Sequence, residues 1–139
     1  MSLVIDASLT MAWYFEGEST PATDALLDRV ADTGAMVPGL WRLEVANALQ
    51  TAIRRQRIDA VYRDASLAEL GLMSITIDAD TSTYAWSATL RLAERFSLTL
   101  YDAAYLELAQ RRSLPLATLD EELQAAATQL NIQLLGRAA

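Results

Sequence analysis

The hydrophobic residues of this 139-residue chain follow two alternating patterns. Short runs of consecutive hydrophobic residues are typical of strands buried on both faces of a sheet, and they predict strands at residues 3–5, 35–37, 74–77, 116–118 and 132–135. Longer segments, which have hydrophobic residues at helical spacing or begin at a capping residue, predict helices at residues 9–15, 21–33, 40–55, 60–71, 81–96, 100–112 and 120–130. Short strands that alternate with helices predict an α/β fold, in which a central parallel β-sheet carries helices on both faces.

Polar residues mark the expected starts of several helices. Ser, Thr and Asp are favoured N-caps because their side-chain oxygens accept hydrogen bonds from free backbone N–H groups. The expected N-caps are Ser8, Thr20, Asp59 and Thr99. No linker rich in Ser, Gly or Pro divides the sequence, and its length suits one hydrophobic core. We therefore expect a single domain over residues 1–139.

Several residue types with important chemical roles are missing: the chain has no Cys and no His, and all 11 basic residues are Arg. Without Cys there are neither disulfides nor thiolate nucleophiles. Without His there are no Ser-His-Asp triads and no usual zinc sites. Without Lys there is neither a P-loop nor Schiff-base catalysis. The remaining chemistry must depend on carboxylates, hydroxyls, Arg or a metal ion.

The sequence contains no signal for export or for a membrane. The first hydrophobic run covers only residues 3–5, which is too short for the core of a signal peptide. No segment approaches the ~20 apolar residues of a membrane-spanning helix. We therefore expect a cytoplasmic protein that does not associate with a membrane.

Four acidic residues from distant parts of the chain are expected at one edge of the sheet. Asp6 ends the first strand, and Asp120 follows the fourth after one turn residue. Asp102 and Glu44 lie in the first turns of two predicted helices. In parallel α/β sheets the ligand crevice lies outside the carboxyl ends of the strands, so these side chains are expected to converge there.

Each acid also has a structural explanation. Asp at a strand end or helix start is a favoured cap and interacts well with the helix dipole. Glu44 shares its helix side with Asn47 and Thr51, and a polar stripe of this kind is usually a solvated face. Convergence of all four acids, rather than any single residue, favours a functional site.

Four carboxylates without His or Lys are suited to bind Mg²⁺ or Mn²⁺, because these ions prefer hard oxygen ligands. One or two such ions can activate a water for attack on a phosphodiester and stabilise the leaving oxygen. The net charge of −7 argues against simple binding of a polyanion. It is compatible with a metal-dependent nuclease, since bound cations offset the repulsion between the acids and the phosphates.

Four segments resemble, in order, the acidic motifs of PIN-domain proteins of the VapC toxin type. These segments are VIDASL, WRLEVANAL, LTLYDAAYLELA and LPLATLDEEL. Together they cover essentially the whole chain, and their spacing also fits. The resemblance implies a PIN-like three-layer sandwich and a Mg²⁺- or Mn²⁺-dependent endoribonuclease that is the toxin of a toxin–antitoxin pair. It also implies an RNA substrate, a homodimer and inhibition by a small cognate antitoxin.

The resemblance assigns roles to particular residues. The metal-binding, catalytic acids of the family correspond to Asp6, Glu44, Asp102 and Asp120. The supporting polar positions correspond to Ser8, Asn47 and Thr118. A helix cap is an equally good explanation for Ser8, and an ordinary strand residue for Thr118.

Other functions remain to be distinguished. A phosphatase of the haloacid dehalogenase type needs a second Asp two residues after the first, where this chain has Ser8, and a receiver domain needs a late Lys. Both are disfavoured, but a non-catalytic PIN-like binding module or another metal-dependent phosphohydrolase stays open. A metal-binding assay and RNA cleavage separate these alternatives.

Aromatic and basic clusters give weaker signals. The aromatic residues at 13–15 and Trp41 are expected to be core or interface residues rather than platforms for base stacking. The Arg pair at 111–112 and the Arg residues at 54, 55 and 57 could contact phosphate. Basic residues near helix ends are more often dipole partners.

Overall fold

The computed structural model describes residues 2–136, and its centre is a five-stranded sheet in the order β3-β2-β1-β4-β5. The strands are β1 (Val4–Ile5), β2 (Ala35–Val37), β3 (Ile75–Ile77), β4 (Leu116–Ala117) and β5 (Leu134–Leu135). All neighbouring strands are parallel, and Val4 pairs with Met36 on one side and with Leu116 on the other. Each strand lies within a predicted segment, although most are shorter than predicted.

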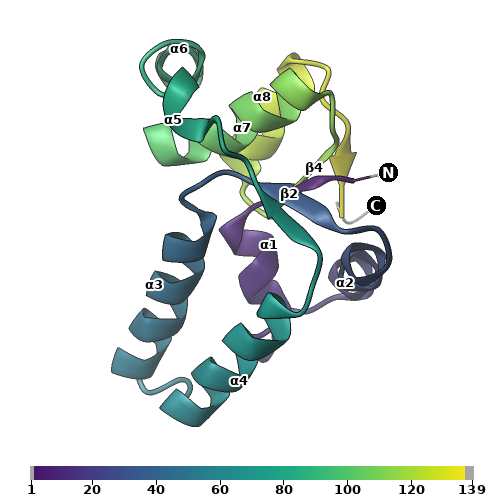
Figure 1. Ribbon diagram of the computed structural model, residues 1–139, viewed down its shortest axis with the longest axis vertical. Helices are drawn as coiled ribbons and strands as arrows, with labels where there is room; N and C mark the ends of the chain where they lie inside the picture. The colour runs from purple at the N-terminus through teal and green to yellow at the C-terminus, as the bar shows by residue number, and fades with distance from the viewer. Residues whose placement is uncertain (1, 137–139) are drawn as a thin grey trace.

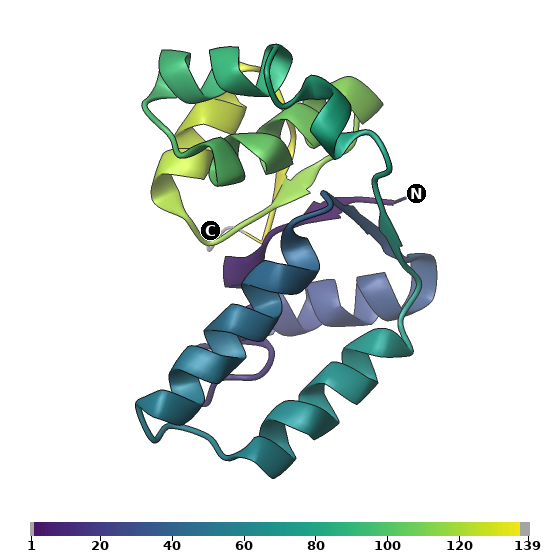
Figure 2. The same cartoon turned by 60° about the vertical axis from the view of Figure 1, so that its left-hand side comes forward.

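Helices connect the strands and cover both faces of the sheet (Figures 1 and 2). They are α1 (Ala7–Ala12), α2 (Pro21–Thr33), α3 (Trp41–Arg54), α4 (Ala60–Gly71), α5 (Thr81–Tyr84), α6 (Ala88–Phe96), α7 (Leu100–Arg112) and α8 (Glu121–Gln129). Helices α1 to α4 lie on one side of the sheet, and α5 to α8 lie on the other. This arrangement confirms the predicted three-layer α/β sandwich.

Most predicted helix starts are confirmed, and one is wrong. Three predicted caps accept a backbone hydrogen bond from the residue three positions later: Thr20, Asp59 and Thr99. Ser8 is not a cap, because the first helix begins at Ala7 and its N-cap is Asp6. Asp6 has the extended backbone typical of an N-cap (φ −102°, ψ 176°), and its carboxylate accepts the Leu9 N–H.

The predicted helix over residues 81–96 is two helices, α5 and α6. The break lies at Ser87, whose backbone is outside the helical region (φ −122°, ψ −100°). The backbone N–H and the hydroxyl of Ser87 both donate to the carbonyl of Tyr84 (3.2 and 3.5 Å). Such local side-chain bonds compete with continuation of a helix. Trp86, beside the break, is 92% exposed.

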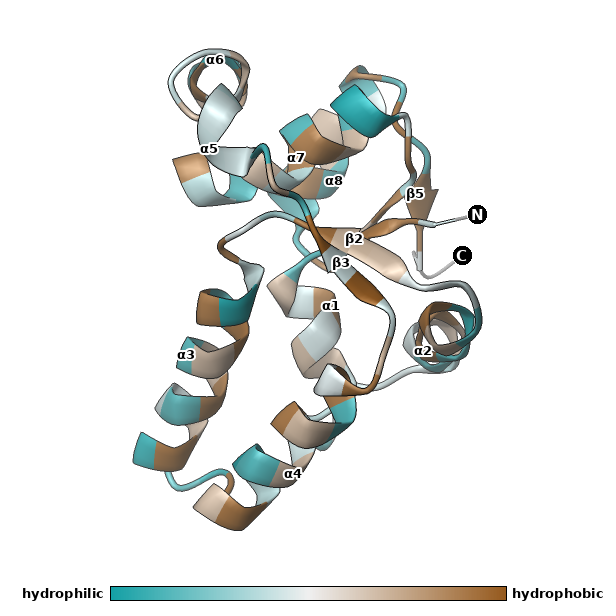
Figure 3. Cartoon of the chain, in the orientation of Figure 1, coloured by the Kyte–Doolittle hydropathy of each residue, from teal (hydrophilic) through white to brown (hydrophobic). Residues whose placement is uncertain are grey.

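Hydrophobic side chains fill the space on both faces of the central strand. Residues of β1 and most residues of α7 are buried. On α3, buried residues lie along one side of the helix and hydrophilic residues occupy other positions (Figure 3). Tyr14 and Trp41 are buried, and Trp13 and Phe15 pack against the core, so the aromatic residues are core residues, as predicted. Among residues 2–136, every helix is too short or too polar to cross a membrane.

Candidate active site

Asp6 and Thr118 lie side by side at the point where the strand order of the sheet reverses. The chain passes from β1 toward one edge of the sheet and later from β4 toward the other edge, and β1 and β4 are neighbours. In sheets of this order, ligands bind outside the carboxyl ends of the strands at this switch point. Asp6 directly follows β1, and Thr118 directly follows β4. The topology therefore places both side chains at the usual position of a ligand site.

Hydrogen bonds fix the carboxylate of Asp6. Its Oδ1 accepts from the Ser8 hydroxyl (2.8 Å) and from the Leu9 N–H (3.0 Å). Its Oδ2 accepts from the Thr118 hydroxyl. Thr118 Oγ1 in turn accepts the Asp120 N–H (3.0 Å). Ser8 and Thr118 therefore hold Asp6 in one orientation and connect it to the loop that carries Asp120.

The environment of Asp6 disfavours its negative charge. Asp6 is only 5% exposed, and burial raises its pKa to about 6, an effect that is partly offset by the hydrogen bonds from Thr118, Leu9 and Ser8. The negative charge of Asp120 raises the pKa further. A nearby cation would relieve both effects, because it favours the charged form of a carboxylate.

Glu44 and Asp102 approach the switch point from opposite layers of the sandwich. Glu44 lies on α3 and accepts a 2.5 Å hydrogen bond from the hydroxyl of Tyr105 on α7. Burial raises the pKa of Glu44, the bond from Tyr105 opposes this rise, and the charge of Asp102 adds to it. Burial, followed by the bond and charge of Glu44, raises the pKa of Tyr105 far above its usual value. Tyr105 therefore remains a hydrogen-bond donor.

Asp120 has both a structural contact and an electrostatic one. Its carboxylate is the N-cap of α8 and accepts the Leu123 N–H (2.9 Å). Asp102 is not a cap, since Thr99 caps α7 and accepts the Asp102 N–H. Burial raises the pKa of Asp102, and the charge of Asp120 raises it further. The structural and the functional explanation of the acids are therefore compatible. Asp6 and Asp120 each cap a helix, and each also repels another acid of the site.

The four acids form a chain of mutual repulsion across the switch point. The interacting pairs are Asp6 with Asp120, Asp120 with Asp102, and Asp102 with Glu44. As the side chains stand, residues 2–136 contain no group of three or more acidic residues placed to hold a metal ion. Mg²⁺ needs fewer protein ligands than that, because it is usually held by one or two carboxylates and keeps several waters. The all-oxygen donor set and the repulsion between neighbouring acids thus fit a hydrated divalent cation.

Asn47, the remaining supporting residue, lies apart from these hydrogen bonds. It is exposed on α3, three residues after Glu44. The structure therefore places it near the acidic group along the helix, at a position open to solvent.

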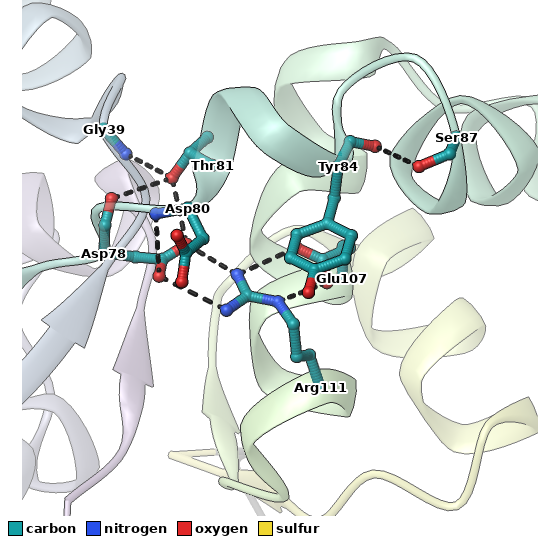
Figure 4. A network of polar contacts seen from close by, with 8 residues as sticks. All are labelled: Gly39, Asp78, Asp80, Thr81, Tyr84, Ser87, Glu107 and Arg111. Carbon is teal, nitrogen blue, oxygen red and sulfur yellow. Dashed lines mark hydrogen bonds and ion pairs between the residues drawn. The ribbon is translucent and has the colours of Figure 1, made fainter.

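A second polar network lies between α5 and α7 (Figure 4). Arg111 bonds to Asp78 (2.6 Å) and to Glu107 (2.8 Å), and its guanidinium lies 4.6 Å from the centre of the Tyr84 ring. Asp78 also accepts from the hydroxyl of Thr81 (3.1 Å). Arg111 is therefore occupied by buried partners within the protein, which argues against a phosphate contact for this residue.

Two contacts near the acids escaped prediction from the sequence. Tyr105 lies three residues after Asp102, and this helical spacing is a signal that could have identified it. Trp41 donates from its indole N–H to Thr10 Oγ1 (3.1 Å), and the Thr10 hydroxyl donates to the backbone carbonyl of Asp6 (2.8 Å). These bonds connect the start of α3 to the start of α1, and no local pattern in the sequence indicates them.

The fold is that of a known class of proteins. The sequence model of the PIN domain matches residues 3–129, and the chain belongs to the PIN-domain family. Ribonuclease VapC3 of Mycobacterium tuberculosis is 32% identical over 126 residues, which are 89% of this chain and 86% of that protein. Ribonuclease VapC3 of Pyrobaculum aerophilum is 28% identical over 123 residues, which are 88% and 92% of the two chains. The resemblance seen in the four motifs is thereby confirmed.

Solved structures share the fold. PAE2754 from Pyrobaculum aerophilum superposes with a TM-score of 0.67 and 26% identity, over 91% of this chain and 79% of its own. Mycobacterium tuberculosis VapC20, described as a Sarcin-Ricin loop cleaving toxin, superposes with a TM-score of 0.65 and 19% identity, over 90% and 95% of the chains. Both similarities support the three-layer PIN-like architecture.

Proposed function

We propose that this protein is a divalent-metal-dependent endoribonuclease and the toxin of a toxin–antitoxin pair. The observation that carries the proposal is the row of mutually repelling carboxylates at the switch point, in a chain whose relatives are named ribonucleases. We assign the metal-binding, catalytic role to Asp6, Glu44, Asp102 and Asp120. An RNA substrate implies that the protein acts in the cytoplasm.

The proposed chemistry divides between the ion and the protein. A bound Mg²⁺ or Mn²⁺ ion supplies an activated water and offsets the charge of the scissile phosphodiester. Asp6, held by three hydrogen bonds, provides a fixed carboxylate at the end of β1. Asp102 and Glu44 provide charge from α7 and α3, and Asp120 provides it from the start of α8. Ser8 and Thr118 act by orienting Asp6.

The first test is the metal requirement of RNA cleavage. Because the chain has no His, we expect water rather than the RNA 2′-hydroxyl to attack, so the products should carry 5′-phosphate and 3′-hydroxyl ends. Cleavage of a panel of structured RNAs should occur with Mn²⁺, stop with EDTA, and be largely lost in Asp102→Asn. Cleavage that persists in EDTA, or products with 2′,3′-cyclic phosphate, would exclude this mechanism.

The same assay separates the alternative functions. A non-catalytic PIN-like module would bind Mn²⁺ and RNA without cleaving it. Another phosphohydrolase would release phosphate from small phosphate esters while leaving every RNA of the panel intact. Metal-dependent cleavage of RNA excludes both alternatives.

We also propose a homodimer that a small antitoxin inhibits. The aromatic residues at 13–15 do not support this, since they pack into or against the core. Other large hydrophobic side chains are exposed instead, including Trp86 (92%), Leu72 (89%) and Leu43 (76%). An antitoxin Arg that reaches the acids would neutralise them and compete with the metal ion.

The dimer is expected in solution at micromolar concentration. Coverage of exposed apolar side chains by a second copy would stabilise it. Sedimentation velocity of the protein alone should give the mass of two chains. A monomeric mass across the micromolar range would contradict the dimer without affecting the proposed nuclease activity.

A further inference from the structure

The hydrogen bond between Tyr105 and Glu44 joins the two helical layers at the acidic group. α3 packs against α1 and α4 on one side of the sheet, whereas α7 packs against α6 and α8 on the other (Figure 1). α3 and α7 themselves have little contact. The 2.5 Å bond from the Tyr105 hydroxyl to Glu44 Oε1 therefore crosses between layers that are otherwise connected mainly through the sheet.

The two partners differ in how firmly the protein holds them. Tyr105 is 1% exposed and has a rigid ring. Glu44 is half-buried on the first turns of α3 and has a long, flexible side chain. The charge of Asp102 repels the Glu44 carboxylate. Within residues 2–136, the Tyr105 hydroxyl is the only hydrogen-bond donor to the Glu44 carboxylate, so its removal would leave this carboxylate without a contact that opposes the repulsion.

We propose that Tyr105 is a positioning residue for the divalent cation and acts through Glu44. Its hydroxyl holds the Glu44 carboxylate of one layer in place beside Asp102 of the other layer, so that both charges are available to one hydrated ion. The inference rests on the proposed function, because it requires Glu44 to belong to the cation site. Residues that orient a metal ligand typically change metal affinity by 10- to 100-fold when they are removed.

The test is Mn²⁺ affinity of the protein without RNA, measured by isothermal titration calorimetry. Tyr105→Phe removes only the hydroxyl, and we expect it to weaken Mn²⁺ binding by about 10-fold or more. The matched control is Tyr14→Phe, because Tyr14 is also buried (7% exposed) and also donates to a Glu, Glu69 (3.3 Å), which is none of the proposed site acids. We expect this control to bind Mn²⁺ as the wild type does, even if it is less stable.

A double-mutant cycle distinguishes action through Glu44 from a general loss of structure. In a Glu44→Gln background, where binding is already weaker, Tyr105→Phe should cause little further loss. Glu44→Asp provides a second variant, because it keeps the charge but shortens the side chain and so draws it away from Tyr105. It should weaken Mn²⁺ binding to a similar degree as Tyr105→Phe, and the two changes together should not add.

The outcomes separate this inference from the proposed function. If Glu44→Gln weakens Mn²⁺ binding and Tyr105→Phe does not, the role of Tyr105 is overturned and the proposed function stands. If Tyr105→Phe weakens binding equally in the wild type and in Glu44→Gln, Tyr105 does not act through Glu44. If Glu44→Gln binds Mn²⁺ as tightly as the wild type, the assignment of Glu44 to the cation site is wrong and the role of Tyr105 fails with it, whereas the proposed nuclease is still tested by the metal requirement of RNA cleavage.

Discussion

Replacing Asp6 with Asn is expected to stabilise the metal-free protein at neutral pH while it removes most of the proposed cleavage activity. Asp6 is buried, and its pKa in the folded state is about 6, compared with about 4 in an unfolded chain. A difference of about two pH units corresponds to about 3 kcal/mol of folding free energy. Asn carries no charge and can still accept the Leu9 N–H as an N-cap, so up to about 3 kcal/mol should be regained.

The pH dependence of this effect has a definite sign. Because the folded-state pKa of Asp6 is raised, the folded protein binds more protons than the unfolded chain between about pH 4 and about pH 6. Wild-type stability should therefore fall as pH rises through this interval, and the advantage of Asp6→Asn should grow over it. Below the interval the two proteins should be similarly stable, and above it the difference should be constant.

Urea denaturation in EDTA at several pH values measures this difference. Asp59→Asn is the matched control, since Asp59 is an exposed N-cap of α4 that accepts the Tyr62 N–H (2.8 Å). Its stability should change by less than about 0.5 kcal/mol. Saturating Mn²⁺ should stabilise the wild type more than Asp6→Asn and so reduce the difference. An Asp6→Asn protein that is less stable than the wild type in EDTA at neutral pH would mean that the hydrogen bonds to the Asp6 carboxylate outweigh the cost of burying its charge.

The alternation of strands and helices could be predicted because it depends on local patterns. Runs such as Leu3-Val4-Ile5 and Ala35-Met36-Val37 have few structural alternatives when they are separated by capped helices. The position of Asp6 and Asp120 at one edge follows from topology, because both acids come after parallel strands. What could not be predicted is which acids repel one another, since this depends on the packing of α3 and α7 across the sheet.

Prediction from the sequence was wrong where a contact with a residue distant in sequence outweighed the local preference for one continuous helix. Residues 81–96 have the composition of one helix, but the chain turns at Ser87, while Tyr84 is stacked on Arg111 of another helix. Arg111 itself, at the end of a predicted helix, has the position of a dipole partner or phosphate ligand. Its partner Asp78 is 33 residues away in sequence, and only the tertiary fold brings the two side chains together.

Replacing Arg111 with Met is expected to cause the largest loss of stability among the substitutions considered, about 3 to 5 kcal/mol. Arg111 is the ion-pair partner of Asp78 and Glu107, whose side chains are 3% and 5% exposed. Removal of one partner leaves buried charges without compensation, which costs far more than loss of a surface ion pair. The contact of the guanidinium with the Tyr84 ring is lost as well.

The loss of stability caused by Arg111→Met should become smaller at low pH. Burial tends to raise the pKa of Asp78, but the hydrogen bonds and charge of Arg111, together with the Asp80 N–H and the Thr81 hydroxyl, hold it below its usual value. In the wild type, Asp78 therefore contributes stability that is present above the unfolded pKa of about 4 and is lost as pH falls through the lower folded pKa. In Arg111→Met, burial instead favours the protonated acid, so this protein should gain relative stability as pH falls.

Urea denaturation in EDTA at neutral and at acidic pH measures both the loss of stability in Arg111→Met and its decrease as the pH falls. Arg112→Met is the matched control, because Arg112 is the next residue of the same helix and is exposed; it should change stability by less than about 0.5 kcal/mol. Adding Asp78→Asn and Glu107→Gln to Arg111→Met removes the buried negative charges that have lost their partner. This triple variant should regain part of the lost stability. If Arg111→Met and Arg112→Met are equally stable, or if the triple variant is less stable than Arg111→Met alone, the ion pairs of Arg111 with Asp78 and Glu107 do not provide the expected stability.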